Sequence, residues 1–540
     1  MSPGRNNFVP HPIRVSQLNH YRIDNPVPTV PKHKPKRVTF REVIRETFYD
    51  YAEMTKVNGM YYLQRNVTSG IPRLLWIVLL ATSLCLGVVL VFLLWKKYVD
   101  SPTRMTVAPE MAVLQVPFPA VTICHPQSVM DYRAEKLVDK LKLPLGATRE
   151  TVLESLPALG YFNEHQWSFP RMQNLQLIDN LLIMNNLTVE EAIQELGMTC
   201  KDLIVVCYWA RKRFPCFGND TFLNWTDSTS HYGACCSFNY HPIVQKSMIP
   251  FAVNTYGIHG GLSVIGTGFP EASDGKSGAL YSEGLMLMIH HPHDFAVEGA
   301  PLTLLGLGSE TFISVSPTDS RCSEQVMLLP QTQRSCIIGK DFPTPIENYR
   351  QPTCMLECLR DEIHRKCGCH PYHLPSQSQI PGRTKQIRKC AVEDSMCLID
   401  NYYMFQRIQC DCLPACGDVT YKTSSVVSDF AAHKFSMNKF YSETNLTKSE
   451  FIFHVYLNNQ LVPANRRVVV VSWISLLANL GGVFSLCLGM SVLSLFEIFF
   501  YVFFRFYRIF QKLKSEKEGV IFVTSITEQQ FHEKRMKQFG

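Results

Sequence analysis

The chain has 540 residues, a mean hydropathy of −0.02 and a formal net charge of +7. This hydropathy is too polar for a protein with many membrane spans, and 18% charged residues are too few for overall disorder. The modest net charge does not indicate a basic nucleic-acid-binding face. Nineteen cysteines are too many for a cytosolic enzyme without metal clusters, which indicates an oxidising compartment. The hydropathy indicates a large water-exposed domain with one or two membrane spans.

Residues 1–73 form a basic segment, with 12 Lys or Arg residues against 5 Asp or Glu residues. Its Pro-rich part is typical of a disordered cytosolic tail. An uncharged run of 22 residues follows from Leu74 to Trp95. At about 1.5 Å per residue this run can cross a bilayer, so we predict a first transmembrane helix over residues 74–97. We expect no signal peptide before it, and we expect the helix to act as its own insertion signal.

Cysteines and glycosylation sequons concentrate in residues 98–467, which we predict to be an extracellular domain. Of the 19 cysteines, 17 lie between Cys124 and Cys416, and neither tail contains one. An oxidising extracellular space explains this distribution better than a reducing cytosol. Asn66 also heads a sequon, but we expect it to face the cytosol and to stay unmodified. The predicted extracellular glycosylation sites are Asn186, Asn219, Asn224 and Asn445.

This extracellular domain contains both helical and strand patterns. Residues 127–200 include helical periodicity, whereas residues 232–320 have glycines and short apolar runs typical of strands and turns. The predicted fold class is mixed α+β. The histidine motif at 290–293 ends an apolar run, and its interpretations are a solvated turn or a metal or proton site. No P-loop, hydrolase or metalloprotease motif is present, so we predict no enzyme, no cofactor and no metal site.

The cysteines between Cys354 and Cys416 are closely spaced and suit either zinc ligation or disulfide bonding. The extracellular setting favours disulfides. Cys354 and Cys358 are spaced i and i+4, which places both on one face of a helix. A returning segment that carries Cys410 and Cys412 could bridge to this face in nested rungs. Such rungs would stiffen the element.

A second uncharged run begins at Val468 and is followed by Glu497 and further apolar residues. We predict a second transmembrane helix over residues 468–504 and a second cytosolic tail over residues 505–540. This tail has 8 Lys or Arg residues against 4 Asp or Glu residues. Both termini are therefore expected in the cytoplasm, and the chain is expected to span the plasma membrane twice.

Small and polar residues within the second run indicate a pore-lining segment. At Gly489-Met490-Ser491 a helix could open its backbone carbonyls toward an aqueous axis, where carbonyl rings replace a cation's hydration shell. Glu497 is ionisable at membrane depth and would favour cations. The alternatives are a helix-packing face of small residues, or small residues that are merely tolerated. Two spans cannot enclose a pore, so we expect several chains around one axis.

Five features resemble the degenerin/epithelial sodium channel superfamily, which includes the acid-sensing channels, and within it the insect pickpocket branch. They are the segments 118–124 (FPAVTIC), 232–239 (YGACCSFN, with a doubled cysteine) and 284–290 (GLMLMIH), ten cysteines between residues 336 and 416, and the segment 477–497. The resemblance covers about residues 45–505. It implies an acid-sensing-channel-like ectodomain with finger, thumb, palm, β-ball and knuckle subdomains.

The resemblance further implies a subunit of a trimeric, sodium-selective, amiloride-sensitive cation channel that is gated through its ectodomain. Its partners would be sodium ions, membrane lipid and related subunits in a homo- or heterotrimer, with no nucleic acid. The implied selectivity filter is Gly489, Met490 and Ser491, and Ala478 is the implied gate. The further implied pore-lining residues are Asn479, Gly482 and Glu497.

A cytosolic gating block is implied at residues 51–59, with Thr55, Asn58 and Gly59 as its key positions. The family's block ends in His-Gly, whereas this chain has Asn58, which cannot carry a charge near pH 7. This departure puts gating as a homomer in doubt. One alternative is therefore a non-conducting or modulatory subunit of a heteromeric channel. A two-span adhesion or peptide receptor without a pore is the alternative from another class.

The resemblance implies eight disulfides and leaves one extracellular cysteine, Cys322, over. We expect Cys322 to be free or bonded to another chain. The implied pairs are Cys124–Cys236, Cys200–Cys235, Cys207–Cys216, Cys336–Cys416, Cys354–Cys412, Cys358–Cys410, Cys367–Cys397 and Cys369–Cys390.

Overall fold

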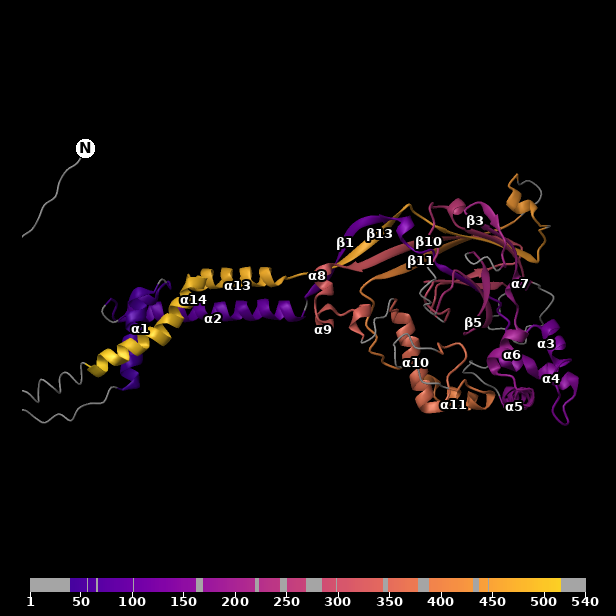
Figure 1. The fold of residues 1–540 in the computed structure, drawn as a ribbon, viewed down its shortest axis with the longest axis horizontal. Helices are drawn as coiled ribbons and strands as arrows, with labels where there is room; N and C mark the ends of the chain where they lie inside the picture. The colour runs from indigo at the N-terminus through magenta and orange to yellow at the C-terminus, as the bar shows by residue number, and fades with distance from the viewer. Residues whose placement is uncertain are drawn as a thin grey trace, which may run out of the picture. The chain divides into compact units, whose positions relative to one another are not determined.

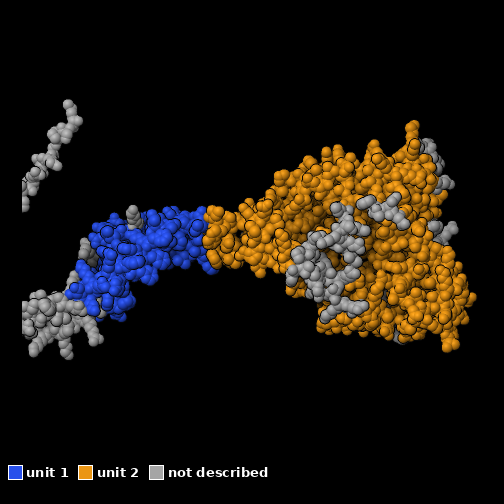
Figure 2. Space-filling view, in the orientation of Figure 1, with its two compact units in different colours: residues 1–93, 477–540 blue, residues 94–476 orange. Residues whose placement is uncertain are grey.

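The computed structural model describes residues 39–55, 57–64, 67–100, 102–161, 169–218, 223–242, 250–268, 284–297, 299–342, 348–376, 388–430, 437–444 and 446–515. Its contacts define two compact units, residues 1–93 with 477–540 and residues 94–476 (Figure 2). We call the first the helical unit and the second the cysteine-rich unit. Of the predicted glycosylation sites, Asn186 is exposed and Asn224 is partly exposed. The sequons at Asn66, Asn219 and Asn445 lie outside the described residues.

The helical unit is built from long apolar helices and a short N-terminal helix. Helix α1 starts at a capping box, in which the Thr39 amide donates to a Glu42 carboxylate oxygen at 3.2 Å. Helix α2 contains the first uncharged run, and its Pro72 lies in the first turn, where proline is tolerated. The helices are α1 (Phe40–Met54), η1 (Met60–Leu63), α2 (Ile71–Asp100), α13 (Trp473–Leu488), α14 (Val492–Phe500) and the π-helical turn η9 (Tyr501–Arg505).

Two apolar stretches in the described residues have the length and composition of membrane spans. Helix α2 passes this test alone, with a mean hydropathy of 3.0 over 18 residues. Helix α13 and the helix from Val492 to Ser515 pass it together, and they are bent by 69° at the break between them. The bend falls at the glycine-containing motif that the sequence marks as a filter.

Two β-sheets form the centre of the cysteine-rich unit (Figure 1). The first has eight strands in the order β1-β13-β10-β12-β7-β3-β4, with β11 paired to β10, and the second has five in the order β5-β6-β2-β8-β9. The strands are β1 (Thr103–Ala112), β2 (Ala120–Cys124), β3 (Ile204–Trp209), β4 (Lys212–Phe214), β5 (Trp225–Ser230), β6 (Gly233–Phe238), β7 (Leu262–Thr267), β8 (Leu285–His290), β9 (Leu302–Leu305), β10 (Ser309–Cys322), β11 (Asp418–Asp429), β12 (Glu450–Leu457) and β13 (Leu461–Val469).

Side chains from both sheets share one hydrophobic core. Phe118 and Phe238 contribute from the second sheet's side, and Phe451 and Phe453 from β12; all four are fully buried. Most of β10 alternates between buried and part-exposed residues, as expected for a strand with one covered face. Every residue of β8 is buried, which matches its continuous apolar run.

The helices of the cysteine-rich unit form two groups along the chain, residues 131–203 and residues 324–405. The helical periodicity of residues 127–200 corresponds to helices that bury a second apolar cluster. The predicted cysteine-bearing helix is α10. The helices and 3-10 turns are α3 (Asp131–Val138), α4 (Arg149–Ser155), α5 (Phe169–Met184), α6 (Val189–Leu196), α7 (Cys200–Leu203), α8 (Glu324–Met327), α9 (Gln331–Arg334), α10 (Gln351–Cys367), α11 (Ser395–Asp400), α12 (Tyr402–Phe405), η2 (Val113–Gln115), η3 (Leu156–Tyr161), η4 (Ile258–Gly260), η5 (Gly339–Asp341), η6 (Val392–Asp394) and η8 (Lys439–Ser442).

Disulfides hold the segment between β10 and β11, which we call the helical insert (residues 323–417). Cys354 and Cys358 lie on one face of α10 and are bonded to Cys412 and Cys410, so the nested rungs are present. Six of the implied pairs occur in the structure: Cys207–Cys216, Cys336–Cys416, Cys354–Cys412, Cys358–Cys410, Cys367–Cys397 and Cys369–Cys390.

The two pairs at the doubled cysteine differ from those implied by the resemblance. Cys124 is bonded to Cys235, and Cys236 is bonded to Cys200. Strand register explains the exchange, because Cys124 on β2 lies directly opposite Cys235 on β6 with a Cα–Cα distance of 4.3 Å. Successive side chains of a strand point to opposite faces, so Cys236 faces Cys200 at the start of α7. The implied pairs Cys124–Cys236 and Cys200–Cys235 are therefore wrong.

The histidine motif at 290–293 is not a solvated turn. His290 and His293 are buried, and the His290 Nε2 atom lies 2.9 Å from the Thr122 hydroxyl. Burial also lowers the pKa of His291 to about 2. Burial lowers the pKa of His290 as well, so His290 and His291 are neutral at neutral pH. The hydrogen bond of His290 to Thr122 serves the packing of the second sheet.

A buried arginine ties the start of α10 to both sheets. The Arg350 guanidinium makes a two-pronged ion pair with Asp294, with both N–O distances at 2.7 Å. A third guanidinium nitrogen contacts Asp418 at the start of β11. Because Arg350 is only 7% exposed, these carboxylates supply the compensation that a buried charge requires.

Candidate functional site

The second apolar helix is broken at Gly489-Met490-Ser491. Gly489 has a φ of +66°, a left-handed conformation that glycine adopts without strain, and its amide donates to the Ser485 carbonyl at 2.9 Å. Helix α14 then starts at Ser491, whose amide donates to the Ser494 hydroxyl at 3.2 Å. Local sequence chemistry therefore ends one helix and starts the next within three residues.

Donors from the N-terminal part of the chain hold the carbonyls at this break. The last carbonyls of a helix have no partners within the helix. The Leu488 carbonyl accepts the backbone amide of Asn58 at 3.1 Å. The Cys487 carbonyl accepts the hydroxyl of Ser83 on α2. The sequence predicted that carbonyls here open toward an aqueous axis, whereas these two are engaged by donors from the same chain.

The predicted gating block forms a turn between α1 and the break. Thr55 follows α1, and its hydroxyl accepts the amide of Val57 at 3.3 Å. Gly59 has a φ of +85°, and a Cβ built on it would lie 3.2 Å from Leu80 and 3.3 Å from Trp76, both on α2. A left-handed backbone and close packing therefore both require glycine at this position.

Asn58 and Gly489 are in direct contact, although 431 residues separate them in the sequence. A Cβ built on Gly489 would lie 2.5 Å from Asn58 Nδ2 and 2.7 Å from Asn58 Cγ. Gly489 is thus constrained twice, by its φ and by the Asn58 side chain. The structure brings one residue of the predicted gating block against one residue of the predicted filter.

An ion pair and an aromatic contact join α1 to the turn after α14. Asp50 on α1 pairs with Arg505, with N–O distances of 2.7 and 3.2 Å. The rings of Tyr51 and Tyr501 pack edge to face with centroids 5.2 Å apart. Sequence reasoning missed these contacts and Ser83, because single polar residues far apart in the chain carry no pairing signal.

The other predicted pore residues do not join this cluster in the single chain. Ala478, Asn479 and Gly482 are exposed on α13, and Glu497 is partly exposed on α14. Within the described residues, a Cβ built on Gly482 has no neighbour within 4 Å other than adjacent residues and the nearby backbone of its own helix. These side chains are therefore available to other molecules or to other copies of the chain.

The described residues contain two groups of thiol and carboxylate ligands close enough to share a metal ion. One includes the sulfurs of Cys336 and Cys416, and the other those of Cys369 and Cys390. Both pairs are disulfide-bonded, so neither offers thiolates in this state.

Comparisons with known proteins agree with this arrangement. The family model described as "Amiloride-sensitive sodium channel" matches residues 51–501. The chain is 28% identical over 501 residues to "Sodium channel protein Nach" of Drosophila melanogaster, covering 87% of this chain and 90% of that protein. It is 22% identical to "Pickpocket protein 11" of the same species, covering 85% and 76%. It is 23% identical to the human "Bile acid-sensitive ion channel", covering 84% and 85%.

The family match covers the whole gating block at residues 51–59, helix α2, the cysteine-rich unit, and helices α13 and α14. The Drosophila relatives also cover most of their own lengths, so the likeness extends over the whole architecture and not one module. The chain therefore belongs to the amiloride-sensitive sodium channel family, and its relatives place it with the insect pickpocket branch of the degenerin/epithelial sodium channel superfamily.

Proposed function

We propose that the chain is a subunit of a trimeric, sodium-selective and amiloride-sensitive cation channel of the plasma membrane. In this proposal α2 and the broken helix of α13 and α14 each cross the membrane, and both termini are cytoplasmic. The cysteine-rich unit is extracellular and receives the stimulus. Copies of the broken helix surround the ion path, with Gly489, Met490 and Ser491 at its narrowest part.

The observation that carries this proposal is the break at Gly489-Met490-Ser491. Non-helical backbone at membrane depth is stable only where protein or a water-filled cavity supplies hydrogen-bond partners. Here Asn58 and Ser83 supply donors to the last carbonyls of α13. Such a clamp fixes the geometry of the break. Glu497 lies in α14, the helix that follows the break, and its carboxylate would attract cations to the ion path.

The test is a voltage-clamp recording of the full chain in oocytes, with surface delivery measured by biotinylation. We expect an inward current that reverses at a more positive potential in sodium than in potassium and falls with amiloride. Ala478→Val adds a bulky side chain at the exposed gate position, and we expect it to increase the resting current. The matched control is Ala81→Val on α2, which we expect to leave the current unchanged.

Two results would contradict the proposal. One is a chain that reaches the surface but adds no cation current, alone or with any pickpocket relative, with or without Ala478→Val. The other is a current that does not distinguish sodium from potassium. The first would favour the receptor without a pore.

A modulatory subunit is the second candidate, and the contact of Asn58 with Gly489 favours it. Asn58 occupies the position of the family's histidine and lies against the predicted filter. A neutral amide there would change how readily the break opens. We expect such a chain to conduct poorly alone and to alter the current of a co-expressed relative, and Asn58→His to increase the current of the chain alone.

A further inference from the structure

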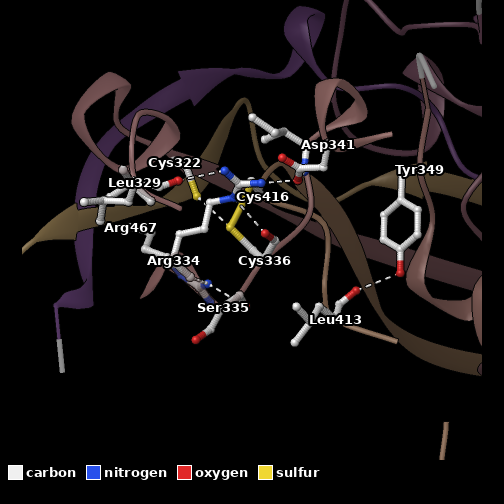
Figure 3. Close-up of a disulfide and its surroundings, with 12 residues drawn as sticks. Cys322, Leu329, Arg334, Ser335, Cys336, Asp341, Tyr349, Leu413, Cys416 and Arg467 are labelled. Atoms are coloured by element: carbon white, nitrogen blue, oxygen red, sulfur yellow. Dashed lines mark hydrogen bonds and ion pairs between the residues drawn. A yellow bond between two sulfur atoms is a disulfide. The ribbon is translucent and has the colours of Figure 1, made fainter. Parts of the chain in front are cut away.

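Three cysteine sulfurs meet at the base of the helical insert. The Sγ atom of Cys322, the last residue of β10, lies 3.6 Å from Sγ of Cys336, which is bonded to Cys416 (Figure 3). All three sulfurs lie within 4.8 Å of one another. In the described residues Cys322 is the one unbonded cysteine outside the apolar helices, the others being Cys85 and Cys487. A free thiol therefore contacts a disulfide.

Hydrogen bonds hold the backbone segments that carry Cys322 and Cys336 in place. Cys322 pairs with Arg467 in the parallel register of β10 and β13. The Arg467 guanidinium donates to the carbonyls of Arg334 and Ser335 at 2.9 and 3.2 Å, and Arg334 Nε donates to the Cys336 carbonyl at 2.8 Å. These hydrogen bonds hold residues 334–336 against β13, the strand that is paired with β10 at Cys322. The sulfur contact follows from this backbone arrangement.

Burial and the neighbouring charges shift the pKa of the Cys322 thiol in opposite directions. Burial raises the pKa of Cys322, and the positive charges of Arg467 and Arg334 offset part of this rise. Arg334 is itself paired with Asp341, and Arg321 beside Cys322 is paired with Asp319. At neutral pH the thiol is mostly protonated, which slows its reaction. Once a thiolate forms at Cys322, the positive charges of Arg467 and Arg334 stabilise it.

We propose that Cys322 and the Cys336–Cys416 bond form an intramolecular thiol–disulfide exchange site. The Cys322 thiol gives its proton to water. Its side chain rotates to bring the sulfur in line with the Cys336–Cys416 bond, and the sulfur then attacks Cys336 Sγ. The Cys336–Cys416 bond breaks, the Cys322–Cys336 bond forms, and Cys416 leaves as a thiolate that takes up a proton. Two electrons move between sulfurs of one chain, so the step needs no external oxidant or reductant.

The exchange changes how the helical insert is attached to the sheets. In the first state, the Cys336–Cys416 bond joins both ends of the insert across a sequence separation of 80 residues. In the second state, Cys336 is tied to β10 instead, across 14 residues, and the end of the insert before β11 is released. This site adjoins β13, which leads directly into α13. The exchange goes beyond the proposed function, because it is a covalent switch in how the helical insert is held to β10 and β11.

Non-reducing peptide mapping of the full-length protein in detergent tests the exchange. The protein is incubated at neutral or mildly alkaline pH, quenched in acid, alkylated under denaturing conditions and digested with trypsin. Cleavage after Arg321, Arg334 and Arg407 separates the three cysteines into peptides 322–334, 335–340 and 408–422. The readout is a pattern of bonds, so it does not depend on whether the chain conducts.

We expect peptide 335–340 to shift from peptide 408–422 to peptide 322–334, with alkylated Cys416. The rate should rise about tenfold per pH unit below the pKa of the thiol, because the thiolate is the attacking species. The Cys358–Cys410 bond, in the same peptide 408–422, is the internal control and should remain intact. Cys322→Ser should abolish alkylation of Cys416, and Cys416→Ser should yield a chain with the Cys322–Cys336 bond already formed.

The proposal is overturned if Cys416 stays unalkylated in the wild type, or if its alkylation persists in Cys322→Ser. It is also overturned if peptide 322–334 is found linked to a second copy of itself, which would make Cys322 an interchain cysteine. A free Cys336 in Cys416→Ser would equally contradict the contact that the structure shows.

Discussion

The contact between Asn58 and Gly489 predicts that Gly489→Ala destabilises the helical unit. An alanine at a φ of +66° carries a left-handed penalty of about 1–2 kcal/mol. Its Cβ would also meet Asn58 Nδ2 at 2.5 Å, so the Asn58 side chain must move. If the amide of Asn58 then loses the Leu488 carbonyl, about 0.5–1.5 kcal/mol more is lost. We expect a total of about 1.5–3.5 kcal/mol.

The measurement is the thermal midpoint of the detergent-solubilised chain, followed by fluorescence size-exclusion chromatography. Gly482→Ala is the matched control, because it lies within a helix and has free space around its Cβ position. Alanine is favoured there by about 1 kcal/mol, so its midpoint should be unchanged or higher. Adding Asn58→Ala to Gly489→Ala removes the atoms that clash, and should restore part of the midpoint.

Two outcomes would refute this reasoning. If Gly489→Ala and Gly482→Ala have the same midpoint, the left-handed end of α13 is not required. If Asn58→Ala lowers the midpoint of Gly489→Ala by the same amount as it lowers that of the wild type, the two side chains do not interact, since independent sites are additive.

Three further predictions concern the cysteine-rich unit. Arg350→Ala leaves two carboxylates without their charge partner, and should cost about 3–5 kcal/mol, seen as a lower thermal midpoint and less surface protein than Arg350→Lys. Cys235→Ser should free the thiol of Cys124, detected by alkylation and peptide mapping, and a free Cys200 instead would restore the pairing implied by family resemblance. Burial acts to raise the pKa of Glu310, but hydrogen bonds from His454 and Tyr441 outweigh it and hold this pKa below 4.5. The ionised Glu310 carboxylate therefore stabilises the fold above about pH 4.5, and this stability is lost as the pH falls through the lowered pKa. Glu310→Gln should make the melting temperature depend less on pH in this acid range.

Local patterns predicted the elements whose physics is local. The i, i+4 spacing of Cys354 and Cys358 gave a helix face, and α10 carries both rungs on that face. The apolar run before His290 predicted a strand, and the structure has β8 there. Likewise, the small residues at Gly489-Met490-Ser491 indicated that the helix could open there, and the structure has a break at this motif with Gly489 at a positive φ.

Register and long-range contacts could not be predicted in this way. Adjacent cysteines such as Cys235 and Cys236 differ only in the face to which they point, and the face depends on the pairing of β2 with β6. The polar motif after β8 gave no sign that neighbouring elements bury it. The proximity of Cys322 to Cys336 depends on the parallel pairing of β10 with β13, whose sequence separation no local pattern spans.

Cadmium block of a Ser491→Cys variant tests most directly that the break in the second apolar helix lines an ion path. Three copies of this thiol around one axis would bind Cd²⁺, which prefers soft sulfur ligands. The account predicts that extracellular Cd²⁺ blocks the sodium current of Ser491→Cys, alone or with a pickpocket relative, and spares the wild type. A variant current of wild-type size that Cd²⁺ leaves unchanged would contradict it.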